Sequence, residues 1–108
     1  MTEDQRVANI KKLVSTSRAV ITGQIGLTIG AIRLSKRLYW LGDKWTENYS
    51  IFDEYLSKID SDIPIGTEKL QWNIDRLIEK ETHLMKIENV YRHKLLQTCD
   101  RIIRDHAS

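Results

Sequence analysis

The residues best suited to chemistry are three histidines, a cysteine and nearby carboxylates in the last third of the chain. The candidate metal ligands are His83, His93, His106 and Cys99. Glu79 and His83 are four residues apart and would share one face of a helix. Di-metal carboxylate sites need Glu-x-x-His pairs, and zinc sites commonly use Cys-x-x-Cys or His-Glu-x-x-His. The sequence contains none of these patterns, so we expect no metal and no cofactor.

The same residues do not form a nucleophile or an acid–base pair. Cys99 falls late in a predicted helix, far from a helix N-terminus that would lower its pKa. Asp53 and Glu54 are adjacent and point to different sides of a helix. Three pairs at i, i+4 spacing are typical of exposed helix faces: Glu79–His83, Glu88–Arg92 and Asp100–Arg104. We therefore expect a protein that is not an enzyme.

A second candidate site consists of small residues. Ala19, Gly23, Gly26 and Gly30 follow one another at spacings of four, three and four, which places them on one face of a continuous helix. Each glycine inside a helix costs about 1 kcal/mol relative to alanine, so close packing must offset the cost. The pattern predicts a bare groove in which another helix packs, with a cofactor or anion groove as the alternative. It matches neither the dinucleotide fingerprint nor the P-loop.

Two arginines extend this face. Arg33 and Arg37 follow Gly30 at helical spacing, and Glu81 is expected at the same height on a neighbouring helix. A partly buried Arg33–Glu81 pair is the structural interpretation. Binding of a carboxylate or phosphate by Arg33 is the functional alternative.

Charge is unevenly distributed along the chain although the net charge is only +2. Residues 1–41 carry seven Lys/Arg against two acids, whereas residues 42–66 carry two against six. A basic helix with adjacent aromatics, Tyr39 and Trp40, is typical of contact with nucleic-acid phosphates. The near-neutral total charge favours internal complementarity and a solvated face instead. Nucleic acid is therefore not the partner that we expect.

The elements that position these residues are all helical. Few breakers in a charged, Leu/Ile-rich chain of 108 residues indicate one all-α domain, residues 1–108. Thr2 and Gln5 form a potential capping box, and Gly42 is a potential stop. We expect an elongated antiparallel bundle of three helices, long, short and long, over residues 3–41, 45–60 and 67–105. The competing possibility is that the first helix kinks or folds back near Gly23.

The heights of these helices predict association. Residues before Arg18 and residues beyond Glu88 would overhang the bundle with apolar stripes exposed, so we expect a homodimer that covers them. The longest uncharged run, residues 19–32, spans about 21 Å as a helix and is too short to cross a bilayer. The single cysteine forms no intrachain disulfide, and we expect a cytoplasmic protein.

Four short segments resemble elements of a known family. Gly23-Gln24 and Ala31-Ile32-Arg33-Leu34 are similar to the Gly-Gln and Ala-Ile-Arg-Ile elements of a bacterial family of unknown function (domain-of-unknown-function family 2489). Ile51-Phe-Asp-Glu-Tyr-Leu and Ile63-Pro64 are similar to a Phe-rich helix and a Val-Pro turn in that family. The resemblance covers residues 10–104 and implies no catalytic residues. Members often carry an N-terminal membrane anchor, which we do not expect in this sequence.

The predicted function is a non-enzymatic helical interaction or assembly module, a homodimer that docks onto a protein partner. A first alternative is a small-molecule or anion sensor that uses the glycine face and Arg33. A second alternative is a nucleic-acid-associated factor that uses the basic first helix.

Overall fold

The structure is a computed structural model that describes residues 2–59 and 74–107, with side chains from residue 82 onward in the second range. Every regular element in these ranges is an α-helix, which confirms the all-α prediction there. The helices are α1 (Glu3–Ile21), α2 (Leu27–Leu41), α3 (Asp43–Asn48), α4 (Ile51–Lys58) and α5 (Ile74–His106).

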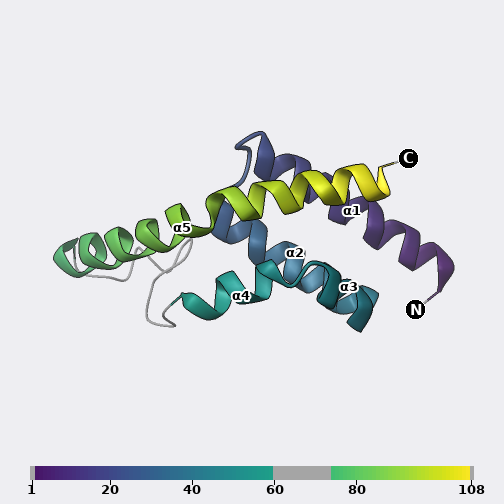
Figure 1. Ribbon diagram of the computed structural model, residues 1–108, viewed down its shortest axis with the longest axis horizontal. Helices are drawn as coiled ribbons and strands as arrows, with labels where there is room; N and C mark the ends of the chain where they lie inside the picture. The colour runs from purple at the N-terminus through teal and green to yellow at the C-terminus, as the bar shows by residue number, and fades with distance from the viewer. Residues whose placement is uncertain (1, 60–73, 108) are drawn as a thin grey trace.

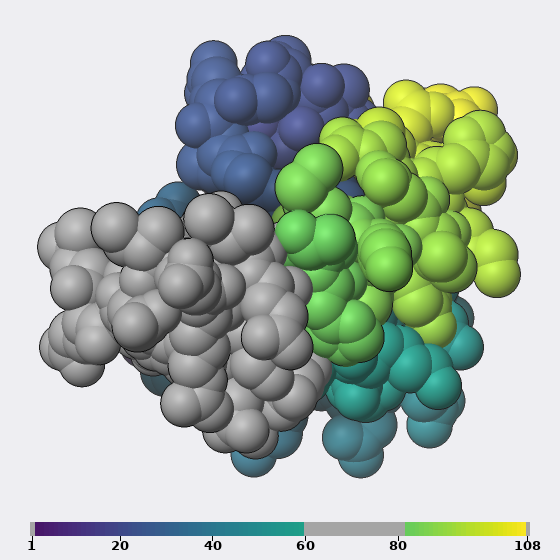
Figure 2. Space-filling model, turned by 90° about the vertical axis from the view of Figure 1, so that its left-hand side faces the viewer, coloured from purple at the N-terminus to yellow at the C-terminus, as the bar shows by residue number. Residues whose placement is uncertain are grey.

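Successive elements reverse direction along the molecule (Figure 1). α1 and α2 form an antiparallel hairpin, α3 and α4 together make the return, and α5 runs back so that it ends beside the middle of α1. α5 contacts α1 on one side and α4 on the other (Figure 2). The predicted long–short–long set of three helices is therefore wrong in detail, because both the first and the second predicted helix are interrupted.

The first interruption is a turn centred on Gly23. This glycine has φ +77°, a left-handed conformation that costs a residue with a Cβ about 1–2 kcal/mol. The Gly23 amide donates to the Val20 carbonyl at 3.2 Å, and the Gln24 amide donates to the Ala19 carbonyl at 2.9 Å. This is the Schellman arrangement that ends helices at glycine. The predicted continuous helix over 3–41 is wrong, and the chain folds back at Gly23.

The turn also overturns the predicted glycine face. Gly23 lies in the turn and Gly26 is the N-cap of α2, so Ala19, Gly23, Gly26 and Gly30 do not share one helix face. A Cβ at Gly23 or Gly26 would meet nothing within 4 Å. At Gly30 a Cβ would lie 2.3 Å from Cγ2 of Val20, so the close helix approach exists at this glycine. Among the three glycines of this pattern, α1 and α2 pack tightly only around Gly30.

Folding back also buries part of the first helix that was expected to overhang, although Val7 is still 41% exposed. Leu13 and Val14 belong to the hydrophobic core, at 0% and 8% exposure. The overhang of residues before Arg18 was one of the two overhangs, with that beyond Glu88, from which a homodimer was predicted. Without it, the homodimer and its protein partner stay predictions.

The second interruption separates α3 from α4. The predicted helix over residues 45–60 nevertheless turns its apolar side chains inward: Tyr49 and Phe52 are buried, and Trp45, Leu56 and Ile59 pack against the core. Tyr55 is fully buried as well. The bare groove in which another helix was expected to pack does not form at Gly23 and Gly26, since both face open space.

The third predicted helix is present as α5. Leu84, Leu95 and Ile102 of its predicted stripe are buried. Its expected start at Thr67 and the side chains of its first residues lie outside the described part of the chain. The capping box at Thr2 and the stop at Gly42 are confirmed, as Thr2 and Gln5 exchange hydrogen bonds and Gly42 ends α2 with φ +123°.

A buried chain of hydroxyls ties α2, α4 and α5 together. The Thr28 hydroxyl donates to Oε1 of Glu88 at 2.8 Å, so the Tyr55 hydroxyl, 2.8 Å away, donates to Thr28. Tyr55 is fully buried and Thr28 is 5% exposed. Thr28 is therefore the central member, because each of the other two groups depends on it.

We expect Thr28→Val to destabilise the protein more than Tyr55→Phe. Thr28→Val leaves a buried phenol without a partner, at a cost of about 1–3 kcal/mol. Tyr55→Phe keeps the Thr28–Glu88 bond and costs about 0.5–1.5 kcal/mol. Urea unfolding of both variants measures the difference. The opposite order would show that the hydroxyls are not coupled in this sequence.

Candidate functional site

A groove between α1 and α2 collects four cationic side chains. Its volume is about 600 Å³, and its floor and walls come from the two antiparallel helices. The lining residues are Lys12, Ser15 and Thr16 of α1 and Arg33, Lys36, Arg37 and Trp40 of α2. The Gly23 turn is the reason that these two sets of residues face one another.

The positive charge of the hairpin is not balanced within it. From Gln5 to Gly42 the sequence has seven Lys/Arg and no Asp or Glu. Within the described ranges, the charged side chains of Lys12, Arg33 and Lys36 make no ion pair or hydrogen bond. Clustered like charges in a concave surface raise the local concentration of anions. The groove is therefore suited to binding an anionic group.

One of the four cations is held in place. Nη1 of Arg37 donates to Oδ1 of Asn9 at 2.8 Å, which joins α2 to α1 across the groove. Asn9 is 8% exposed and Arg37 is half-buried, so this contact is partly shielded from water. An arginine fixed by one nitrogen keeps its other donors for a ligand, since the guanidinium group has five N–H groups. Arg37 thus gives the groove a positioned charge beside three cationic side chains without a partner in the described residues.

An exposed aromatic side chain continues the groove. Trp40 is 65% exposed and lines both the groove and a second hollow of about 440 Å³ beside Gln5, Ala8 and Asn9. Its neighbour Tyr39 is 79% exposed. Large aromatic side chains are usually at least partly buried, so the exposure of Trp40 in the groove, and of Tyr39 next to it in the sequence, indicates that these rings are available to a ligand.

The structure brings together only some of the predicted site residues. Arg33 and Arg37 line the groove, whereas Gly23 and Gly26 do not. The side chain of Glu81 lies outside the described residues, so the predicted Arg33–Glu81 pair is not tested. Ser15 and Thr16 of α1 were not predicted as site residues, and Lys12 was considered only as part of a basic helix and not as a residue facing Arg33. Their i, i+3 and i, i+4 spacing was a usable signal, but only with the hairpin in place of a continuous helix.

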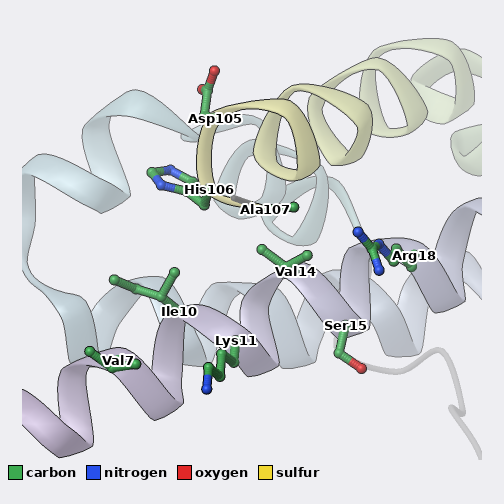
Figure 3. A pocket seen from close by; sticks show the side chains of 9 residues that line it. All are labelled: Val7, Ile10, Lys11, Val14, Ser15, Arg18, Asp105, His106 and Ala107. Carbon is green, nitrogen blue, oxygen red and sulfur yellow. The ribbon is translucent and has the colours of Figure 1, made fainter.

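A second cavity lies between α1 and the end of α5 (Figure 3). It has a volume of about 770 Å³, and Ile10 and Val14 point into it from α1. His106 and Ala107 close it from α5, while Asp105 points away. Lys11 and Arg18 also line this cavity, so it has two Lys/Arg side chains and the acid Asp105, whereas the α1–α2 groove has four Lys/Arg side chains and no acid.

The candidate reactive groups near the end of α5 are engaged in packing. The Tyr49 hydroxyl donates to Oδ2 of Asp105 at 2.8 Å and lies 2.9 Å from Nε2 of His106. The His106 ring stacks on Trp45 with 4.6 Å between centroids, and Arg101 lies over the Tyr49 ring. Burial, reinforced by the hydrogen bond to Asp105, raises the pKa of Tyr49 to about 12. This cluster anchors α5 to α3.

Cys99 is equally unsuited to nucleophilic attack. It is fully buried, and this burial raises the pKa of its thiol to about 11. In the described residues, no three of the His, Cys, Asp and Glu side chains are placed to hold a metal ion.

No helix in the described ranges is both long enough and apolar enough to cross a bilayer. Comparison with protein-family models, curated proteins and solved structures gives no significant match to this chain. The resemblance to the bacterial family of unknown function stays a prediction.

Proposed function

We propose that this protein is a non-enzymatic helical binding module that docks onto an anionic macromolecule through the α1–α2 groove. The observation that carries the proposal is the set of four cations in one concave surface, three of them without a partner in the described part of the chain. An anionic ligand would relieve their mutual repulsion and release counterions from the ligand.

The other parts of the molecule support a binding role rather than catalysis. The described groups with raised pKa values are Tyr49, Tyr55 and Cys99, and all three are buried in packing contacts. Catalytic groups instead line an accessible cleft and have pKa values close to the working pH. The groove contains lysine, arginine, hydroxyl and indole groups, which bind anions well.

The test is binding of inorganic polyphosphate by calorimetry to the wild type and to two charge-reversed variants. Arg33→Glu with Lys36→Glu is expected to weaken binding by about tenfold or more, because two phosphate contacts become repulsive. The matched control, Lys86→Glu with Lys94→Glu, makes the same charge change on exposed positions of α5. It is expected to change affinity by less than about threefold, through long-range charge alone.

Equal losses in the two double variants would show that polyphosphate responds to net charge and not to the groove. Absence of polyphosphate binding at low salt would contradict the proposal directly. Circular dichroism of each variant checks that the helices are retained.

A further inference from the structure

We infer that the anionic ligand is a single-stranded nucleic acid, with its phosphates on the groove cations and a base stacked on Trp40. The inference rests on the proposed function and adds the chemical class of the ligand. It was the partner that the near-neutral net charge of the chain argued against. The net charge is a poor guide here because the charge is segregated: residues 5–42 carry seven Lys/Arg and no acid, and the acids of the α1–α2 hairpin are Glu3 and Asp4 in the first turn of α1.

The indole of Trp40 lies where a ligand bound to the groove cations can also reach it. Trp40 lines the groove together with Arg37 and Lys36 and is 65% exposed, so one ligand can reach the cations and the ring at once. Tyr39 adds a second exposed ring at the end of α2. A basic groove that follows a phosphate backbone, combined with aromatic platforms for bases, is the general design of single-strand binding surfaces.

The groove suits a single strand better than a duplex. Stacking on an indole requires a free base face, and base pairing within a duplex keeps these faces stacked on one another. Helices packed side by side have axes about 8–10 Å apart, so the groove between them admits one strand rather than a whole double helix. The hydroxyls of Ser15 and Thr16 lie in the same groove and can bond to phosphate or to base edges.

The groove also suits a nucleic acid better than an acidic protein segment. Glutamate and aspartate side chains would satisfy the cations of the groove equally well. Their carboxylates could accept a hydrogen bond from the indole N–H, but they would gain nothing from the ring face, because its electron density repels an anion, whereas a base can stack on that face. An exposed Trp40 at the groove therefore favours a ligand that carries both phosphates and aromatic bases.

The test is fluorescence polarisation with a labelled oligothymidylate of about ten nucleotides, a length within the usual range of single-strand sites. Three further ligands separate the possibilities: an abasic strand with the same phosphates, a duplex of the same length and a polyglutamate peptide. We expect the oligothymidylate to bind most tightly. With three to four phosphate contacts, log K should fall against log salt with a slope of about −2 to −3.

Variants of Trp40 then test the stacking. Trp40→Leu should weaken oligothymidylate binding by about 5-fold to 150-fold and leave inorganic polyphosphate binding within about twofold. Trp40→Phe keeps an aromatic ring and should retain most of the affinity. Since Trp40 is largely exposed, neither variant is expected to unfold the protein.

The outcomes separate this inference from the proposed function. If the abasic strand binds as well as the oligothymidylate, or Trp40→Leu has no effect, the inference fails while a polyanion groove remains. If polyglutamate or the duplex binds more tightly, the ligand is an acidic protein or a double strand and the inference again fails. If neither polyphosphate nor any of the four ligands binds, the proposed function fails as well.

Discussion

Replacing Gly30 with leucine is expected to destabilise the protein by about 3 kcal/mol or more, a large part of a typical stability of about 5–15 kcal/mol. Already a Cβ at this position would lie 2.3 Å from Cγ2 of Val20, and a β-branched side chain on a helix has little freedom to move away. The whole leucine side chain would push α2 away from α1. Urea unfolding followed by circular dichroism measures the loss.

Gly26→Leu is the matched control on the same helix. A Cβ at Gly26 meets nothing within 4 Å, and loss of a glycine N-cap costs less than about 1 kcal/mol. A continuous glycine face would make both substitutions equally damaging, so equal losses would contradict the hairpin. Partial rescue of Gly30→Ala by Val20→Ala would identify the contact responsible.

Raising the pH above about 9 is expected to destabilise the protein progressively, because three buried acids hold their protons more tightly when folded. Burial raises the pKa of Cys99 from 9.0 to about 11. Burial also raises the pKa of Tyr55 from 10.0 to about 12, with the Glu88 carboxylate adding to the effect and the Thr28 hydrogen bond partly offsetting it. Tyr49 behaves in the same way.

The sign follows from proton binding. Between pH 9 and 11 the unfolded chain releases the Cys99 proton while the folded chain keeps it, so stability falls as pH rises. The slope is about 1.4 kcal/mol per pH unit for one group, which makes the loss from Cys99 up to about 3 kcal/mol by pH 11. The tyrosines add to the loss between pH 10 and 12.

Urea unfolding at about pH 8, 9 and 10, in the wild type and in Cys99→Ala, measures this slope. The variant has a lower stability at pH 8 because of the small cavity, and it should lose less than the wild type over the next two pH units. Parallel curves for the two proteins would show that Cys99 does not cause the pH dependence.

Local sequence signals predicted the helices, but the signal that α1 ends at Gly23 was given too little weight. The capping box at Thr2, the stop at Gly42 and the apolar stripe of α5 depend on neighbours in sequence, and all three were read correctly. Gly23 was also a local signal, since a single glycine at the residue after a helix C-cap ends helices without any proline. Three glycines at helical spacing concealed it, because the same residues fit both a packing face and a turn.

The site could be predicted only as far as α2. Arg33 and Arg37 were identified from their spacing, but Lys12 enters the groove through the fold-back that the sequence analysis ranked second. The exposure of Trp40 depends on which helix faces pair, and tertiary packing decides this rather than local sequence. The burial of Tyr55 has the same origin.

The hydrogen bond between Asn9 and Arg37 holds α1 and α2 of the hairpin together. Every side chain around the groove belongs to one uninterrupted stretch from Lys12 to Trp40, so evolution can retune what the groove recognises without altering α4 or α5. The remaining helices then only support the groove, and in proteins that evolve from this one the ligand specificity should change first through substitutions within that stretch.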